Sequence, residues 1–355
     1  MIKEKASLSL PEELDFLIIR LSSLGDIIHT LPALAALRKH FPQARIGWVV
    51  ESKGSEILEW VSGLDRIFVL PTSQRKPAGF LLKPALAGFF KTLRQALRSQ
   101  GKALDFQGLL KSGLIAFLSG ARTRLGFSRP NLREPQAAWF YTQTVPPFDE
   151  TNHVIDKNLR LLQLLGVSPP SWEFPLVVEA KVKEKIKTLL SELQPSSNLP
   201  ILVANVGAAW PTKRWPASHW IDYLRKIRAS GRFSPFILWG TPEERKLAEE
   251  ISRESKVPRL PYLTIKEVMA LIDLTDLLVS GDTFALQVAA ALEKPTVGLF
   301  GPTNPQRNGP WHKASRVAVT PLECRNCYAR RCREATCLAA IPPEEVWQLT
   351  LELVD

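Results

Sequence analysis

The sequence predicts an α/β protein built from two domains, each with a parallel sheet covered by helices. Short apolar runs of the length of buried strands alternate with helical segments, from 16–19 near the start to 296–300 near the end. Strands that alternate with helices need crossover connections, which make the strands parallel. The segment 167–175 contains three prolines in nine residues and is the strongest linker signal in the chain.

We place the domain boundary in this linker, giving an N-terminal domain of 1–170 and a C-terminal domain of 171–355 that ends in a helix. A chain of 355 residues is long enough for two hydrophobic cores. Two similar α/β halves joined by a linker predict the GT-B arrangement, in which two Rossmann-like domains hold parallel sheets facing a central ligand cleft. Further strands are expected at 45–50, 66–70, 201–205, 236–239 and 277–280, with another ending near 105.

The composition is that of a globular protein, with 45% hydrophobic and 23% charged residues. No run of 18 apolar residues occurs, so the sequence predicts no membrane-spanning helix. Residues 1–10 carry charges and lack an apolar signal core and a cleavage site. We therefore expect a cytoplasmic protein.

The net charge of +11 includes a long basic segment: between Asp65 and Asp105 there is no acidic residue. Basic residues there, including Arg75 and Lys76, are interleaved with leucines and phenylalanines. This pattern fits an anionic membrane surface or a phosphorylated lipid headgroup, while a solvated helix face is the alternative. A nucleic-acid partner is disfavoured because no nucleic-acid-binding motif is present.

A strand, a tight turn and a helix are predicted at 16–40, with Asp26 close to the start of the helix. The carboxyl end of a parallel strand is where open α/β folds bind ligands. Asp26 is either a first-turn capping residue or a proton acceptor, since a helix N-terminus favours an ionised carboxylate. The two roles are compatible.

A second strand-to-helix turn is predicted at 103–113, and it carries Asp105, Gln107, Lys111 and Ser112. Polar side chains at such a turn either contact a ligand or cap and solvate the loop. The sequence leaves both roles open.

Four cysteines lie within fourteen residues near the C-terminus, at Cys324, Cys327, Cys332 and Cys337. The spacing C-x2-C-x4-C-x4-C is typical of a metal site, and a set of thiolates suits zinc or iron. We expect a structural metal here; reduced thiols or a disulfide are the alternatives. No catalytic role is assigned to these residues.

Several motifs resemble those of one family. Residues 21–34, LSSLGDIIHTLPAL, resemble the opening motif of glycosyltransferase family 9, the lipopolysaccharide heptosyltransferases, and most closely its heptosyltransferase I branch. The resemblance continues at 105–112, at the K-x-W-P pattern of 213–216, at 239–244 and at 279–295. It covers most of 16–350.

The resemblance implies that Asp26 is the general base and that Lys213 neutralises the diphosphate of the donor. It implies donor-binding roles for Gly25, Ala208, Ala209, Glu244, Leu263, Asp282, Thr283, Phe284 and Gln287. It implies acceptor-binding roles for Ser23, Arg75, Lys76, Asp105, Gln107, Lys111 and Arg133. The sequence departs from the family pattern at four donor positions: Phe284 replaces a glycine, Gln287 replaces a histidine, and Ala208 and Ala209 replace hydroxyl residues.

The function implied is inverting transfer of heptose from ADP-heptose to the Kdo–lipid A core of lipopolysaccharide, with no cofactor for catalysis. The enzyme would work at the cytoplasmic face of the inner membrane as a peripheral protein. Two alternatives are another nucleotide sugar as donor, and a non-catalytic descendant that binds a glycolipid or a partner protein.

Overall fold

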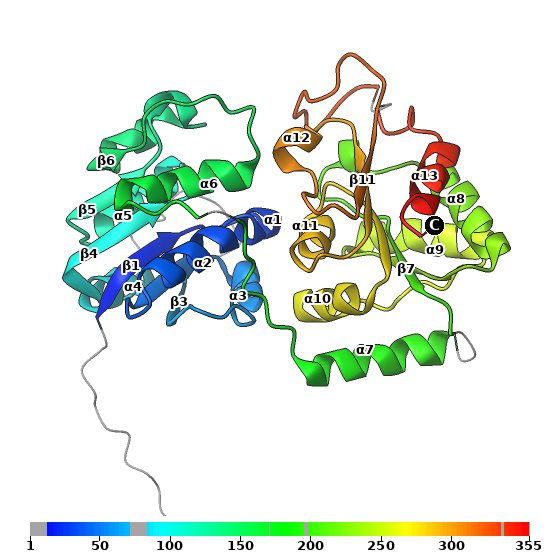
Figure 1. The fold of residues 1–355 in the computed structure, drawn as a ribbon, viewed down its shortest axis with the longest axis horizontal. Coiled ribbons are helices and arrows are strands. Elements are labelled where there is room, and N and C mark those ends of the chain that lie inside the picture. The colour runs from blue at the N-terminus through cyan, green and yellow to red at the C-terminus, as the bar shows by residue number, and fades with distance from the viewer. Residues whose placement is uncertain (1–12, 72–83, 170, 195–197, 335–336, 355) are drawn as a thin grey trace, which may run out of the picture. The chain divides into compact units, whose positions relative to one another are not determined.

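The computed structural model describes residues 13–71, 84–169, 171–194, 198–334 and 337–354 (Figure 1). The chain divides into two compact units. Unit 1 consists of Met1–Glu150 and Ile155–Pro175, and unit 2 of Thr151–Val154 and Leu176–Asp355. The main division falls after Pro175, at the end of the proline-rich stretch. None of the helices in the described ranges is long and apolar enough to cross a bilayer.

Unit 1 is built on a sheet of six strands in the order β3-β2-β1-β4-β5-β6. Every pairing between neighbouring strands is parallel. The strands are β1 (Leu14–Ile19), β2 (Ile46–Val50), β3 (Arg66–Val69), β4 (Leu97–Asp105), β5 (Thr123–Gly126) and β6 (Gln143–Thr144). This is the strand order of the Rossmann fold. Successive strands are added toward one edge of the sheet up to β3 and toward the other edge from β4 onward, so the strand order reverses between β1 and β4.

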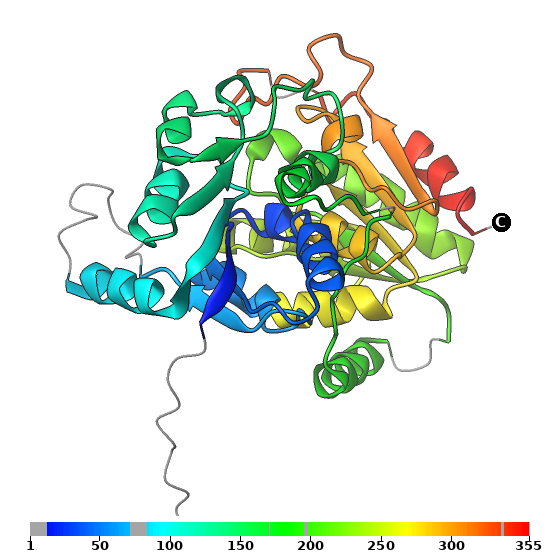
Figure 2. The ribbon, with the colours of Figure 1, turned by 60° about the vertical axis from the view of Figure 1, so that its left-hand side comes forward.

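Helices cover both faces of this sheet (Figures 1 and 2). They are α1 (Leu24–Ile28), α2 (Leu31–His40), α3 (Ser52–Leu58), α4 (Pro84–Ala96), α5 (Leu110–Leu118) and α6 (Val154–Leu162), with short 3-10 helices η2 (Arg129–Asn131), η3 (Pro135–Phe140) and η4 (Gln163–Leu165). Side chains alternate along β1, so that Leu17 and Ile19 join a core cluster with α4 and α5. Phe16 points to the other face and contacts Phe41, which follows α2.

In the described part of the basic segment before Asp105, α4 is amphipathic, with its apolar side toward the protein, which agrees with the alternative of a solvated helix face. Leu86, Phe90 and Leu93 of α4 are buried in the core of unit 1, and the chain from Leu97 onward is strand β4. The apolar side of α4 therefore faces the protein, and only its polar side faces solvent. Arg75 and Lys76 lie outside the described residues.

Unit 2 is built on a sheet of five parallel strands in the order β11-β10-β9-β7-β8. The strands are β7 (Ile201–Asn205), β8 (Ser234–Leu238), β9 (Leu277–Gly281), β10 (Thr296–Phe300) and β11 (Ser315–Val319). The helices are α7 (Ala180–Leu193), η5 (Pro211–Lys213), α8 (Ala217–Ser230), α9 (Pro242–Ser255), α10 (Ile265–Leu274), α11 (Phe284–Ala291), α12 (Pro305–Asn308) and α13 (Pro343–Leu351).

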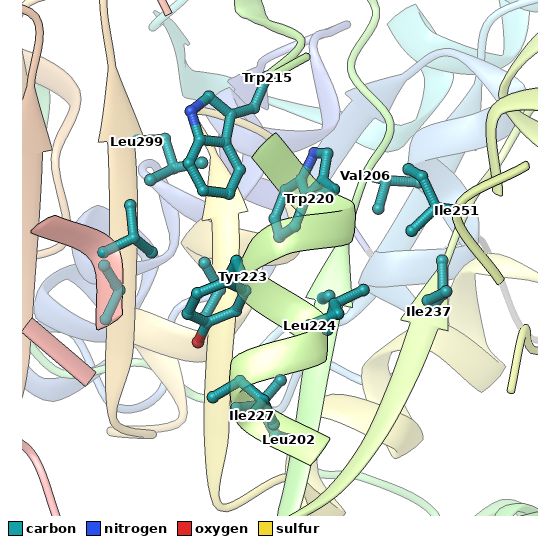
Figure 3. Packing of buried hydrophobic residues seen from close by; sticks show 14 of the residues in the cluster. Leu202, Val206, Trp215, Trp220, Tyr223, Leu224, Ile227, Ile237, Ile251 and Leu299 are labelled. Atoms are coloured by element: carbon teal, nitrogen blue, oxygen red, sulfur yellow. The ribbon is translucent and has the colours of Figure 1, made fainter. Parts of the chain in front are cut away.

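The core of unit 2 lies between this sheet and the helices α8, α9 and α13 (Figure 3). Trp215 and Trp220 pack edge to face, with ring centroids 4.9 Å apart, and Tyr223 lies beside both. The Trp215 indole donates to the carbonyl of Ile341, and the Tyr223 hydroxyl lies 2.9 Å from Thr350 Oγ1. These bonds attach the C-terminal helix to the core.

The two sheets share a feature that positions a site. In open α/β sheets, ligands bind beyond the carboxyl ends of the strands where the strand order reverses. In unit 1 this point lies between β1 and β4, and in unit 2 between β7 and β9. Asp26 follows β1 and Lys213 follows β7, so each lies on a turn at the reversal point of its own sheet.

Candidate active site

In unit 1 the turn after β1 presents the carboxylate of Asp26. Asp26 lies in the first turn of α1, and its Oδ2 accepts hydrogen bonds from the Ser23 backbone N–H (3.1 Å) and hydroxyl (2.9 Å). The side chain is 32% exposed, so solvent or a substrate can reach it. Its predicted capping contact is therefore present, and it leaves the group accessible for chemistry.

Arg20, the last residue before this turn, holds the other oxygen of Asp26. Its Nη2 lies 2.8 Å from Asp26 Oδ1, and its Nη1 donates to the carbonyl of Phe106, which follows β4. The Arg20 side chain is 8% exposed. This buried guanidinium thus ties the carboxylate to both turns at the reversal point.

The charges around Asp26 determine its protonation. Burial by itself would raise the pKa of the carboxyl, but the positive charge of Arg20, the nearby His29 and the Ser23 hydrogen bonds outweigh that effect and lower the pKa to about 2. Asp26 is therefore ionised throughout the neutral pH range, as a proton acceptor must be.

The turn after β4 carries Asp105 and Gln107, which we predicted to bind an acceptor. Gln107 Oε1 accepts from the backbone N–H groups of Leu21 (3.0 Å) and Ser22 (3.2 Å), and so braces the turn after β1. Asp105 is fully buried; it accepts from two backbone N–H groups of its own turn and from the Tyr141 hydroxyl (2.7 Å). Burial raises the pKa of the Asp105 carboxyl despite these bonds.

The other predicted acceptor residues are more accessible. Lys111 Nζ lies 2.7 Å from Glu51 Oε1, and both side chains are more than a third exposed. Arg133 is exposed. Asp105 and Gln107 therefore brace the turns of the site through hydrogen bonds, while Lys111 and Arg133 are two cationic side chains of unit 1 that a ligand can reach.

In unit 2 the turns after β7 and β9 bring Lys213 and Asp282 together. Lys213 Nζ lies 2.6 Å from Asp282 Oδ2, and both side chains are mostly buried. The same ammonium lies 4.3 Å from the centre of the Trp210 ring, which is cation–π geometry. The lysine side chain is thus fixed by an ion pair and by an aromatic ring.

A hydroxyl and amide network holds the turn after β9 against β7. Asn205 Nδ2 donates to Ser280 Oγ (2.9 Å) and to Thr283 Oγ1 (3.0 Å). A Cβ atom at Gly281 would lie 2.8 Å from the backbone oxygen of Lys213, so this position needs a glycine. Thr283 is thereby held at the N-terminus of α11, where backbone N–H groups favour an anion.

Two of the four substitutions that set this sequence apart from the family pattern lie on α11. Phe284 is the first residue of the helix and is half-buried. Gln287 is buried, and its Nε2 donates to Asp282 Oδ1 (3.2 Å) and to the carbonyl of Asn308 (2.8 Å). Gln287 therefore orients the partner of Lys213 from within the protein.

Glu244, the residue predicted to hold the nucleotide ribose, closes a capping box at the start of α9. Its Oε2 accepts from the N–H groups of Gly240 (2.9 Å) and Thr241 (3.0 Å), and Oε1 lies 3.6 Å from Arg214 Nη2. A Cβ atom at Gly207 would lie 2.4 Å from this carboxylate, so the turn after β7 packs directly on Glu244. The side chain is only 6% exposed.

The remaining predicted donor residues differ in exposure. Ala208 and Leu263 are buried, whereas Ala209 is exposed. Sequence reasoning missed three residues that organise the site: Arg20, Tyr141 and Asn205. Only Arg20 gave a signal in the sequence, as a lone charge ending a buried apolar run.

The structure does not support the predicted metal site. Cys324, Cys327 and Cys332 are exposed and Cys337 is half-buried, and all four are free thiols. Cys337 points inward, where its Sγ lies 3.8 Å from the carbonyl oxygen of Thr212. Within the part of the chain that the structure describes, no group of three or more His, Cys, Asp or Glu side chains is arranged to hold a metal ion. The donor set therefore does not fit a metal, and no step is assigned to one.

Two Rossmann-like units with parallel sheets form the fold of the GT-B class. The likeness to solved structures agrees. E. coli heptosyltransferase WaaC, solved with ADP and with ADP-2-deoxy-2-fluoro heptose, superposes with TM-scores of 0.74 and 0.72 at 24% identity, covering 95% of this chain and 99% of that one.

The chain belongs to glycosyltransferase family 9, the heptosyltransferases, whose family model matches residues 90–338. Lipopolysaccharide heptosyltransferase 1 of Pseudomonas aeruginosa PAO1 is 30% identical over 89% of this chain and 86% of that protein. The E. coli K12 protein of the same name is 26% identical over 86% of this chain and 94% of its own length. The predicted family and fold class are confirmed. The chain is a glycosyltransferase, so the alternative of a non-catalytic descendant is dropped.

Proposed function

We propose that this enzyme transfers heptose from ADP-heptose to the Kdo–lipid A inner core of lipopolysaccharide, with inversion at the anomeric carbon and without a metal ion. The clamped, ionised carboxylate of Asp26 at the reversal point of unit 1 is the observation that carries the proposal. The names of the relatives support heptose transfer to lipopolysaccharide. Unit 1 binds the acceptor, and unit 2 binds the nucleotide sugar.

Asp26 acts as the general base. In a single displacement the acceptor oxygen attacks the anomeric carbon, its proton passes to the Asp26 carboxylate, and the bond from that carbon to the diphosphate oxygen breaks. Arg20 and Ser23 hold the carboxylate in place, which removes the entropy cost of orienting it during the reaction. Lys111 and Arg133 are the cations of unit 1 that we assign to anionic groups of the acceptor.

Lys213 acts on the leaving group. As the glycosidic bond breaks, negative charge develops on the ADP diphosphate, and a preorganised ammonium stabilises that charge. The ion pair with Asp282 and the Trp210 ring fix the ammonium before the donor binds. Thr283 and the N-terminus of α11 provide further donors for phosphate oxygens.

The geometry of Gln287 and Glu244 bears on the choice of donor. Gln287 is buried against Asp282 and Asn308, and Glu244 caps α9 with one oxygen while the other lies near Arg214. Each of these two side chains makes more than one contact within the protein. Each is therefore less free to bind a nucleotide than an exposed side chain would be. A donor that carries a nucleotide other than ADP is therefore the alternative to ADP-heptose. Titration with four nucleotides distinguishes these two donors.

The proposal is tested by calorimetric titration with ADP, UDP, GDP and dTDP. We expect selective binding of ADP, weakened at least tenfold in Lys213→Ala because a charge-assisted contact is lost. Lys246→Ala is the matched control, since Lys246 is an exposed lysine on α9. Selective binding of UDP, GDP or dTDP would transfer the proposal to another sugar, and an unchanged affinity in Lys213→Ala would remove its assigned role.

The acceptor is tested by incubating ADP-heptose with Kdo–lipid A and analysing the product by mass spectrometry and NMR. The expected product carries one added heptose whose anomeric configuration is opposite to that of the donor. Retained configuration would contradict the single displacement.

A further inference from the structure

The solvent-facing side of α5 in unit 1 is apolar, which is unusual for a surface helix. Leu110, Leu114 and Phe117 share one face of this helix by their spacing. Leu110 is 45% exposed and Phe117 53%, while the opposite face, with Ile115 and Ala116, is buried in the core. The apolar character of α5 is therefore not explained by packing on the sheet alone.

The short helix η3 extends this surface. Phe140 of η3 contacts Phe117, with ring centroids 6.0 Å apart, and the N-terminus of α5 is tied to the residue before η3 by the bond from Leu110 N to Glu134 Oε2 (2.7 Å). Trp139, which precedes Phe140 in η3, is 69% exposed. We call Leu110, Leu114, Phe117, Trp139 and Phe140 the α5–η3 surface.

The charges around this surface are positive. Arg124 lies over the Phe117 ring at 5.5 Å and donates from Nε to the carbonyl of Phe140. Between Asp105 and Asp149 the sequence has five basic residues and one acidic residue, Glu134, which is engaged at the start of α5. Exposed aromatic rings beside Arg124, in a stretch of the chain with net positive charge, match an interface of apolar chains and anionic headgroups.

We propose that the α5–η3 surface binds the enzyme to an anionic lipid bilayer, with Phe117 and Trp139 inserted among the headgroups. This inference rests on the proposed function in one respect, because a lipid-linked acceptor requires its enzyme to work at a membrane. It replaces the basic segment before Asp105 as the membrane-binding element, since the apolar side of α4 is buried in the core. Arg124 and the net charge of +11 favour an anionic lipid surface over a second copy of this basic chain, which would repel it.

The test is sedimentation of the full-length protein with phosphatidylcholine vesicles, with and without phosphatidylglycerol. We expect binding to the anionic vesicles that weakens with added salt. The double variant Phe117→Ser/Trp139→Ser is expected to partition at least tenfold less, because withdrawing one large aromatic side chain from an apolar phase already costs about a factor of ten. Val177→Ser/Leu199→Ser, which removes two exposed apolar side chains of unit 2, is the control and should bind as the wild type does.

Three results would overturn the inference: no binding of the wild type to anionic vesicles, equal binding of the double variant, or a wild-type dimer in light scattering that the double variant loses. Transfer to a water-soluble, deacylated acceptor separates this inference from the proposed function. If the inference alone is wrong, the double variant still transfers to the soluble acceptor and still binds vesicles. If the proposed function is wrong, neither protein transfers to either acceptor.

Discussion

At the scale of single residues, the protein fixes its candidate base from two sides before any substrate arrives. Ser23 occupies one oxygen of Asp26 and Arg20 the other. Burial raises the pKa of Asp26, but the charge of Arg20, the nearby His29 and the Ser23 hydrogen bonds outweigh it and lower the pKa to about 2, which makes Asp26 a weak base in the free enzyme. The contacts therefore orient the Asp26 carboxylate and keep it ionised, but they also lower its affinity for a proton.

Arg20→Met tests this balance through the pH profile. Losing the guanidinium removes a charge that favours the ionised carboxylate, so the pKa of Asp26 should rise from about 2 toward the ordinary value of about 4. Stability and activity that depend on the ionised group are present above the pKa and lost as pH falls through it. The wild type should therefore lack an acid limb from Asp26 above about pH 4, and the variant should gain one near that pH.

The measurement is kcat/KM against pH for the wild type, Arg20→Met and Arg20→Lys. Arg20→Lys keeps the charge and should retain most of the wild-type profile. Superimposable profiles for all three proteins would show that Arg20 does not control the protonation of Asp26.

A second residue-scale prediction concerns Gln287. Gln287→Leu leaves Asp282 Oδ1 and the Asn308 carbonyl without their donor, and each unsatisfied buried group costs roughly 1–3 kcal/mol. The unfolding free energy measured with urea should fall by about that amount, and ADP should bind more weakly because Asp282 is no longer held toward Lys213. Unchanged ADP affinity in a destabilised variant would make Gln287 a purely structural residue.

A functional residue can be predicted from the sequence when its contacts lie within one continuous motif, and not when they join distant parts of the chain. The turn with Asp26 and the turn with Lys213 are continuous motifs, so their positions at strand ends could be predicted. The contact of Arg20 with Phe106 and of Gln107 with Leu21 joins turns 86 residues apart, and it depends on β1 pairing with β4. Such register is not encoded in either turn alone.

At the scale of elements, the predictions differ in accuracy according to how strong each signal was. The strands at 201–205 and 296–300 were predicted to the residue because they are continuous apolar runs. β5 and β6 were missed because they are short and contain polar residues. The amphipathic pattern of α4 was recognised, but periodicity cannot distinguish a core from a membrane as the partner of an apolar face.

The close approach of β9 and η5 gives an element-scale prediction. In Gly281→Ala the new Cβ would lie 2.8 Å from the Lys213 backbone oxygen, so the turn carrying Lys213 must move. We expect a loss of about 1–3 kcal/mol in unfolding free energy, measured with urea, and weaker ADP binding measured by calorimetry. Gly88→Ala is the control: it lies in α4 with no atom near its Cβ position, and should stabilise the protein by about 0.5–1 kcal/mol. Equal effects of the two substitutions would contradict the assigned contact.

At the scale of the whole molecule, the chain is two separate α/β units with distinct cores and distinct strand orders. Composition and alternation were enough to predict two domains of this class. The four cysteines show the opposite case. Their spacing is typical of a metal site, but the fold turns Cys337 inward onto Thr212 while the other three face solvent.

The assignment of nucleotide binding to unit 2 predicts which turns ADP protects from hydrogen exchange. Hydrogen exchange with and without ADP should show protection in the turns after β7 and β9 of unit 2, with little change in the turn after β1. Because bound ligand stabilises only the state that binds it, protection should grow with ADP concentration. Protection confined to the turn after Ile19 would reverse the assignment of the two units.

The most direct test of the account is the turnover of Asp26→Asn with ADP-heptose and Kdo–lipid A. Asparagine has a similar shape but accepts no proton, so kcat should fall about 10²–10⁴-fold while the ADP affinity stays unchanged. Asp222→Asn, an exposed carboxylate on α8, should keep wild-type turnover. Near-normal turnover of Asp26→Asn would contradict the claim that Asp26 accepts the proton from the acceptor.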